Sequence, residues 1–240
     1  MTAPTLAQLL DDAAFLSFEH QLHLAEVVGN HSWEVDFDGP RFAFTGDNPL
    51  ECTQLHLLGS AAPGPRSWLW SWANPSGFNP AVTGLAEHVR GFGEQHGITE
   101  LASGEVPFDA LPGSPSGPDH VASILLEAAK AISGRYTAYT GDAGGGTRVA
   151  FLIEHPAFQL PPPESPRVMR VIQQCIAELP TLSDHRRALY SYASRRGMAP
   201  QFSQDHTQLR LSFNGFQATV QFDEQGRVGN INASMGQPQP

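Results

Sequence analysis

Cysteine and long apolar runs are both scarce in this chain. Of its 240 residues only Cys52 and Cys175 are cysteines, and they stand far apart without CxxC spacing. This excludes a disulfide framework and a zinc ribbon. No apolar run approaches the ~18 residues of a membrane-spanning helix, and the first residues lack the basic segment of a signal peptide. We therefore expect a cytoplasmic protein that does not enter a membrane.

Charged residues are also few, and those present are mainly acidic. They make up 16% of the chain, with 14 Lys and Arg against 24 Asp and Glu, which gives a formal net charge of -10. A negative charge of this size repels nucleic acid and anionic membranes at long range. The sequence therefore predicts a partner that is either a protein with a basic or neutral surface or a small ligand, and leaves the oligomeric state open.

Motifs of catalysis and of metal or cofactor binding are missing as well. There is no GxSxG element, and His20 and His23 form an HxxH pair that is not the HExxH of a metalloprotease. The glycines at 144–146 lack the lysine and the helix of a P-loop. We therefore predict no catalytic residue, no metal site and no cofactor. Glu19 and Glu26, on the same helix as the two histidines, are predicted to face solvent.

Three of the four tryptophans stand within five residues. If this stretch is a strand, Trp68, Trp70 and Trp72 share one face, because successive strand side chains alternate. A core position is favoured, since large aromatic side chains usually fill cores. The alternative is a wall on which a flat ligand stacks. In that case we expect the ligand-binding residues to be the three tryptophans with Asn74 and Ser76, which lie where the strand passes to a helix.

Strand and helix periodicities are mixed along the chain and predict an α+β fold. Short turns between successive strands indicate an antiparallel sheet meander, with helices packed on one face. Helices are predicted near residues 5–29, 80–97, 117–133, 166–179 and 183–192, and strands near 33–37, 42–44, 51–61, 68–73, 136–139, 149–153, 209–213, 216–222 and 227–231.

A proline run gives the clearest candidate for a domain boundary. Three consecutive prolines within residues 160–164 form a stiff connector. We predict an α+β domain with the tryptophan strand over residues 1–160. Residues 165–235 are predicted to be a helix-hairpin-strand segment, which either forms a small second domain or completes the first. Asn214-Gly215 between alternating strands signals a hairpin, so this segment loosely repeats the helix-plus-hairpin plan of the N-terminus.

The order of several segments resembles a family of uncharacterised bacterial proteins. The resemblance rests on an N-terminal helix, a hairpin from Trp33 to Phe44, Leu58-Gly59-Ser60, Trp68-Leu69-Trp70-Ser71-Trp72-Ala73-Asn74 and Phe92-Gly93-Glu94-Gln95-His96-Gly97. The WLWxWAN segment is its specific part, and the similarity covers about residues 5–155. The resemblance implies a bacterial protein of unknown role, and it carries over no activity, cofactor or site residue.

The sequence leaves the function unknown and several hypotheses open. Because the sequence has no catalytic motif, it favours a non-catalytic cytoplasmic module that binds a protein or a ligand. The acidic charge also suits an immunity or inhibitor protein that acts against a basic toxin or nuclease. A small-molecule enzyme with a pocket on the face of Trp68, Trp70 and Trp72 is a third hypothesis. The fourth is an assembly protein that pairs through the edge of the hairpin 209–222.

Overall fold

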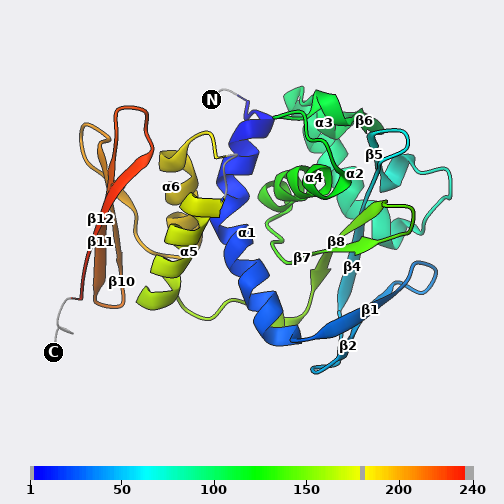
Figure 1. Cartoon of the computed structure of the whole chain (residues 1–240), viewed down its shortest axis with the longest axis horizontal. Helices are drawn as coiled ribbons and strands as arrows, with labels where there is room; N and C mark the ends of the chain where they lie inside the picture. Colours follow the sequence, from blue (N-terminus) through cyan, green and yellow to red (C-terminus); the bar gives the residue numbers. More distant parts are fainter. Residues whose placement is uncertain (1–2, 179–181, 236–240) are drawn as a thin grey trace. The chain divides into compact units, whose positions relative to one another are not determined.

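The computed structural model describes residues 3–178 and 182–235 and has the predicted α+β fold. Every pair of neighbouring strands in it is antiparallel. The chain divides into two compact units that share the first helix (Figure 1). The first unit comprises Met1–Leu9 and His20–Gln159, and the second comprises Leu10–Glu19 and Leu160–Pro240.

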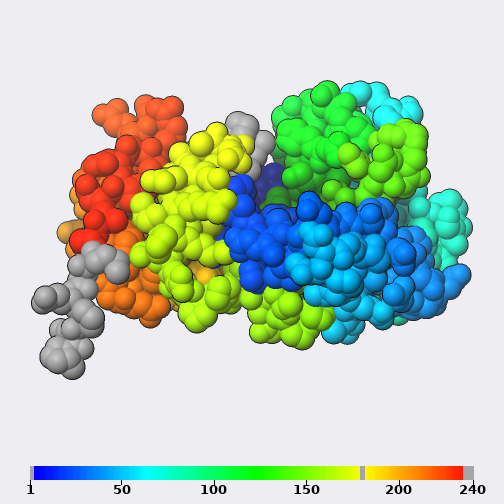
Figure 2. Space-filling view, turned by 60° about the horizontal axis from the view of Figure 1, so that its bottom comes forward, coloured from blue at the N-terminus to red at the C-terminus, as the bar shows by residue number. Residues whose placement is uncertain are grey.

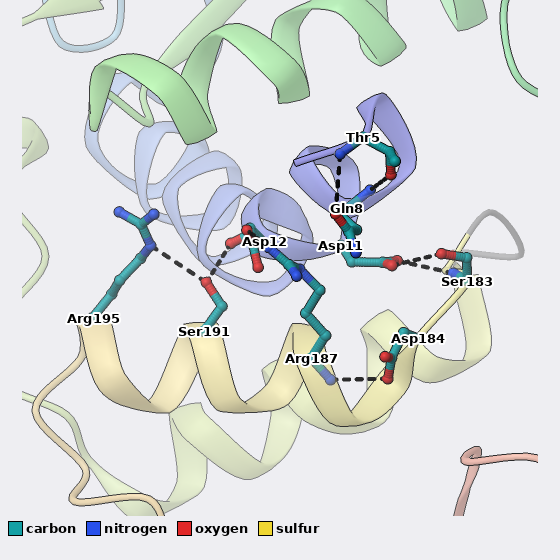
Figure 3. Close-up of polar contacts among 9 residues, drawn as sticks. All are labelled: Thr5, Gln8, Asp11, Asp12, Ser183, Asp184, Arg187, Ser191 and Arg195. Carbon is teal, nitrogen blue, oxygen red and sulfur yellow. Dashed lines mark hydrogen bonds and ion pairs between the residues drawn. The ribbon is translucent and has the colours of Figure 1, made fainter. Parts of the chain in front are cut away.

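Helix α1, Leu6–Val28, begins with a capping box. The Thr5 hydroxyl accepts a hydrogen bond from the Gln8 backbone, and the Gln8 side chain accepts one from the Thr5 backbone (Figure 3). The helix ends at Gly29, whose φ of 61° favours glycine. The helix predicted over residues 5–29 is therefore confirmed.

Two sheets build the first unit. The smaller has the order β1-β2-β3 and the larger has the order β6-β5-β4-β8-β7. The strands are β1 His31–Asp36, β2 Arg41–Gly46, β3 Leu50–Glu51, β4 Gln54–Ala62, β5 Ser67–Trp70, β6 Glu105–Pro107, β7 Ala138–Asp142 and β8 Arg148–Glu154. The strands predicted up to residue 73 thus divide between two sheets, because β3 pairs with β2 while β4 pairs with β5 and β8.

Helices α2, Pro80–His96, and α4, Pro118–Ser133, pack against β4. The helix predicted near residues 80–97 is confirmed, and Asn79 caps it, because its side chain accepts a hydrogen bond from Ala81 N and Pro80 occupies the first turn. The remaining short helices are α3 Thr99–Ala102, η1 Ser71–Ala73, η2 Phe108–Ala110 and η3 Pro156–Phe158. One buried cluster joins α1, β2, β4 and β8 through Leu24, Val28, Phe42, Phe44, Leu55, Leu57, Phe151 and Ile153.

The tryptophan stretch is shorter as a strand than the sequence predicts. β5 ends at Trp70, and Trp72 lies in the 3-10 helix η1. The prediction of one row of three indoles is therefore wrong for Trp72. The chain turns here because the Ser71 hydroxyl donates to the Leu57 carbonyl oxygen at 2.6 Å, which fixes the residue after the strand against β4.

The second unit joins two helices to a four-stranded sheet of order β12-β11-β10-β9. Its elements are α5 Ser165–Glu178, α6 His185–Arg195, β9 Gln201–Phe202, β10 Gln208–Phe213, β11 Phe216–Phe222 and β12 Val228–Met235. Asn214 and Gly215 have φ values of 46° and 75°, the left-handed conformation that a tight hairpin turn needs at both central residues. The predicted C-terminal hairpin is therefore confirmed.

Polar contacts join the α1 segment Leu10–Glu19 to the rest of the second unit (Figure 3). The Asp11 carboxylate accepts hydrogen bonds from the backbone and the hydroxyl of Ser183. Burial raises the pKa of Asp11, although these hydrogen bonds oppose the shift. Asp12 forms an ion pair with Arg187 at 2.5 Å, and its backbone carbonyl accepts from the Ser191 hydroxyl.

Glu19 is fully buried, so the prediction that it faces solvent is wrong. Its carboxylate lies 2.9 Å from Arg196 Nε and 3.3 Å from Arg167 Nε, and it accepts a hydrogen bond from the Tyr192 hydroxyl. Burial, followed by the nearby Glu19 carboxylate, raises the pKa of Tyr192. Glu26, seven residues further along the helix, is exposed as predicted.

Candidate functional site

An apolar pocket of about 270 Å³ lies within the first unit. Its walls come from β1, β4 and β8, from the β7–β8 turn, and from the residues between β5 and α2. The lining residues are Trp33, Val35, Phe37, Leu57, Gly59, Ser60, Ser71, Asn74, Phe78, Ala143, Thr147, Val149 and Phe151. The pocket therefore draws on segments that are more than 110 residues apart in the sequence.

Aromatic rings form the main walls of this pocket. The Trp33 and Phe151 ring centroids are 5.9 Å apart, and those of Phe37 and Phe78 are 5.0 Å apart. Trp33 lies directly over Gly141 of β7, where a Cβ atom would overlap the indole ring. Glycine at this position therefore allows the indole to approach the sheet closely.

Few polar groups reach the pocket. The Ser71 hydroxyl is already used by the Leu57 carbonyl. The Asn74 side-chain oxygen accepts a hydrogen bond from Ser76 N at 3.0 Å, while its amide NH₂ group has no partner among the described residues. Ser60 and Thr147 also line the pocket and carry hydroxyl groups. The lining thus offers a ligand a mainly apolar surface with a few hydrogen-bonding side chains, at Ser60, Asn74 and Thr147.

The predicted ligand-binding residues are only partly brought together by the fold. Trp68 and Trp70 are fully buried, and the Trp70 indole N–H donates to the Glu100 carbonyl. Trp72 is half-buried and packs under the Arg90 guanidinium, 4.5 Å from the ring centroid. None of the three lines the aromatic pocket, whereas Asn74 does. Ser76 is exposed and lies outside the lining.

Sequence reasoning missed the aromatic residues that do form the pocket. Alternation along residues 33–37 places Trp33, Val35 and Phe37 on one face, as the sequence indicates. The opposite wall, with Val149 and Phe151, belongs to a strand that is distant in the chain. No local sequence pattern connects the two walls. The pocket therefore could not be predicted from a single sequence.

A second, polar pocket of about 340 Å³ in the first unit includes Arg135 and Glu154. The Glu154 carboxylate lies 2.9 Å from His56 Nε2 and 2.5 Å from Arg135 Nε. Burial alone would raise the pKa of Glu154, but the hydrogen bonds from His56 and Arg135 outweigh it and hold the pKa below its usual range. These contacts fasten the end of β8 to β4 and to residue 135.

Glu154 is expected to make the stability of the folded state decrease at acid pH. Because its pKa is lowered in the folded state, its contribution to stability is fully present above the ordinary carboxyl pKa of 4.5. That contribution is lost as the pH falls through the pKa that Glu154 has in the folded state. We expect Glu154→Gln to flatten the pH dependence of the urea midpoint below pH ~4.5. Glu87→Gln, at an exposed position of α2, serves as the control. If Glu154→Gln leaves the pH dependence of the urea midpoint unchanged, the Glu154 carboxylate does not have this stabilising role.

No group of three or more His, Cys, Asp or Glu side chains within residues 3–178 and 182–235 is placed to hold a metal ion. Over the same residues, no helix has both the length and the apolar character needed to cross a membrane.

The fold and the pocket together define a protein of the α+β class with antiparallel sheets and an aromatic cavity in its N-terminal unit. The chain belongs to a family of unknown function, DUF6882, whose model matches residues 7–156. This range contains the whole aromatic pocket, and it agrees with the resemblance to an uncharacterised family over about residues 5–155. No curated protein and no solved structure matches the chain.

Proposed function

We propose that the first unit is a non-catalytic binding module whose aromatic pocket accepts a flat apolar group. The observation that carries this proposal is the convergence of Trp33, Phe37, Phe78 and Phe151 on one cavity. A cavity of about 150 Å³ holds a benzene molecule. A pocket of about 270 Å³ therefore suits one substituted ring or two fused rings.

The composition of the lining supports binding rather than catalysis. None of the thirteen described residues that line the pocket carries an acidic, basic or thiol side chain. General acid–base chemistry needs a titratable group within hydrogen-bond reach of the reacting atoms. The pocket supplies ring stacking, worth about 0.5–1.5 kcal/mol for each aromatic pair. The polar side chains of Ser60, Asn74 and Thr147 can orient a ligand by hydrogen bonds.

Indole and naphthalene are suitable probes of this proposal. We expect them to shift the backbone NMR signals of pocket residues such as Gly59 and Thr147. Val149→Phe should narrow the cavity and weaken binding by about tenfold or more, because Val149 lies on the pocket wall. Val228→Phe, which changes a half-buried valine on β12 of the second unit, should leave binding unchanged. Equal affinity of the two variants would exclude this pocket as the site.

The acidic surface supports a second proposal, an immunity or inhibitor protein that binds a basic toxin or nuclease. The first unit carries most of the acidic excess of the chain, and such charge speeds association with a basic partner. We also retain the proposals of a bacterial origin and a cytoplasmic location. The face of Trp68, Trp70 and Trp72 offers little to an enzyme, because Trp68 and Trp70 have no exposed area.

For the domain organisation, we propose that residues 165–235 form a second domain that requires the α1 segment 10–19. This proposal is supported by the buried Glu19 and by the contacts of Asp11 and Asp12. They connect the segment to α5, to α6 and to residues that flank α6 on both sides.

A further inference from the structure

Among the strands that the structure describes, β1 pairs with β2 alone, so its other edge is free. The Phe42 carbonyl of β2 accepts a hydrogen bond from Cys52 N, so the backbone of Phe42 is directed away from β1. Val35 is opposite Phe42 and Trp33 is opposite Phe44. Because opposite residues in an antiparallel pair alternate between bonded and non-bonded, the N–H and C=O groups of Trp33 and Val35 point outward. Within the described residues, neither backbone has a hydrogen-bond partner.

The residues at this free edge are also the residues that line the aromatic pocket. The side chains of Trp33 and Val35 contribute to the lining, whereas no described residue of β2 does. The pocket therefore lies on the side of β1 that is away from β2. Figure 2 shows this hairpin, in blue, on the outer surface of the first unit.

Acidic side chains occupy the opposite face of the same strand. Glu34 and Asp36 alternate with the pocket residues and are exposed, with 64% of the Glu34 side chain accessible. Arg41 is the nearby cation, and it lies closer to Glu51, at 2.8 Å, than to Glu34, at 3.8 Å. An additional strand beside β1 would thus meet an apolar cavity on one face and negative charge on the other.

We propose that β1 binds an extended peptide segment with alternating apolar and basic side chains, which adds to the sheet as an edge strand. This inference rests on the proposed function, because the apolar side chains of the segment occupy the aromatic pocket. Backbone hydrogen bonds to Trp33 and Val35 hold the segment, as in other β-strand additions. Its basic side chains lie next to Glu34 and Asp36, since neighbouring residues of paired strands point to the same face.

The probe is the synthetic peptide acetyl-Lys-Phe-Lys-Val-Lys-Phe-Lys-amide, with a version that carries Glu in place of Lys as its control. We expect the lysine peptide to bind, and more weakly as salt is raised. Amide exchange at Trp33 and Val35, measured by NMR, should slow when the peptide is bound. The amides of Ser32 and Glu34 already face β2 and should change little.

Two charge reversals form a matched pair of variants. Glu34 and Glu51 are both opposite Ala43, so they lie in one row across the sheet, with side-chain exposures of 64% and 60%. Glu51 is two strands from the free edge, at a distance of ~10 Å. We expect Glu34→Lys to weaken binding of the lysine peptide by about tenfold and Glu51→Lys by less than about threefold.

Five outcomes decide the inference. Slowed exchange at Trp33 and Val35 together with selective loss in Glu34→Lys supports it. Equal losses in both variants, or peptide binding without slowed exchange, overturn it. Binding of naphthalene without binding of the peptide also overturns it while leaving the pocket proposal intact; Glu34 and Asp36 then only protect the edge from aggregation. Absence of binding by both probes overturns the inference and the pocket proposal together.

Discussion

Glu19→Ala is expected to lower the free energy of unfolding of the second unit by about 3–5 kcal/mol. The substitution removes the carboxylate that Arg196, Arg167 and Tyr192 share, at N–O distances of 2.9 and 3.3 Å for the two arginines. Only 10% of the Arg196 side chain and 20% of the Arg167 side chain are exposed. Two largely buried cations would lose their counter-charge, and little water could replace it.

Hydrogen exchange of the amides in β10 and β11 measures this effect within the second unit. A loss of about 3 kcal/mol corresponds to roughly hundredfold faster exchange through unfolding. Glu26→Ala, an exposed position on the same helix, is the control and should stay within about 0.5 kcal/mol of the wild type. Exchange in Glu19→Ala as slow as in the control would show that this cluster does not hold the unit together.

Trp70→Ala is expected to destabilise the first unit by about 3–5 kcal/mol. Trp70 has no exposed area, packs edge to face against Trp68 at 5.4 Å, and donates its indole N–H to the Glu100 carbonyl. Its removal would leave a cavity between β5 and the residues before β6, and it would take away the hydrogen bond to the half-buried Glu100 carbonyl.

Trp72→Ala provides the matched comparison two residues later. Trp72 is half-buried and its ring lies beneath Arg90, so we expect a loss of about 1–2 kcal/mol. Urea unfolding of both variants, followed by far-UV circular dichroism, gives the two free energies. Similar losses at Trp70 and Trp72 would mean that all three indoles do form one buried row, as strand alternation alone suggests.

The three tryptophans show where strand alternation predicts burial correctly and where it fails. The strand period correctly placed Trp68 and Trp70 in the core, because a half-buried strand buries alternate side chains. It failed at Trp72, because the hydrogen bond from Ser71 to Leu57 turns the chain into a 3-10 helix. That hydrogen bond joins residues 14 positions apart, and the alternation of residues along the strand does not predict it.

Glu19 is a residue whose sequence pattern predicts exposure to solvent, but which is buried in the structure. Helical spacing groups it with Glu26, and that grouping indicates one solvated face. The arginines that pair with Glu19 come from residues 167 and 196, beyond the proline run. A single sequence shows the charges but not which of them meet.

By itself, the sequence determined the local structure of this protein: the helices near residues 5–29 and 80–97, the Asn214–Gly215 hairpin and the α+β class. Each of these depends on interactions within a few residues, which composition and spacing record directly. Only the tertiary structure decided that β4 pairs with β8, that Trp33 faces Phe151 across a pocket, and that β1 keeps an edge to which no other described strand bonds. These contacts join segments far apart in the chain, and they follow from the packing of the whole unit rather than from any local preference.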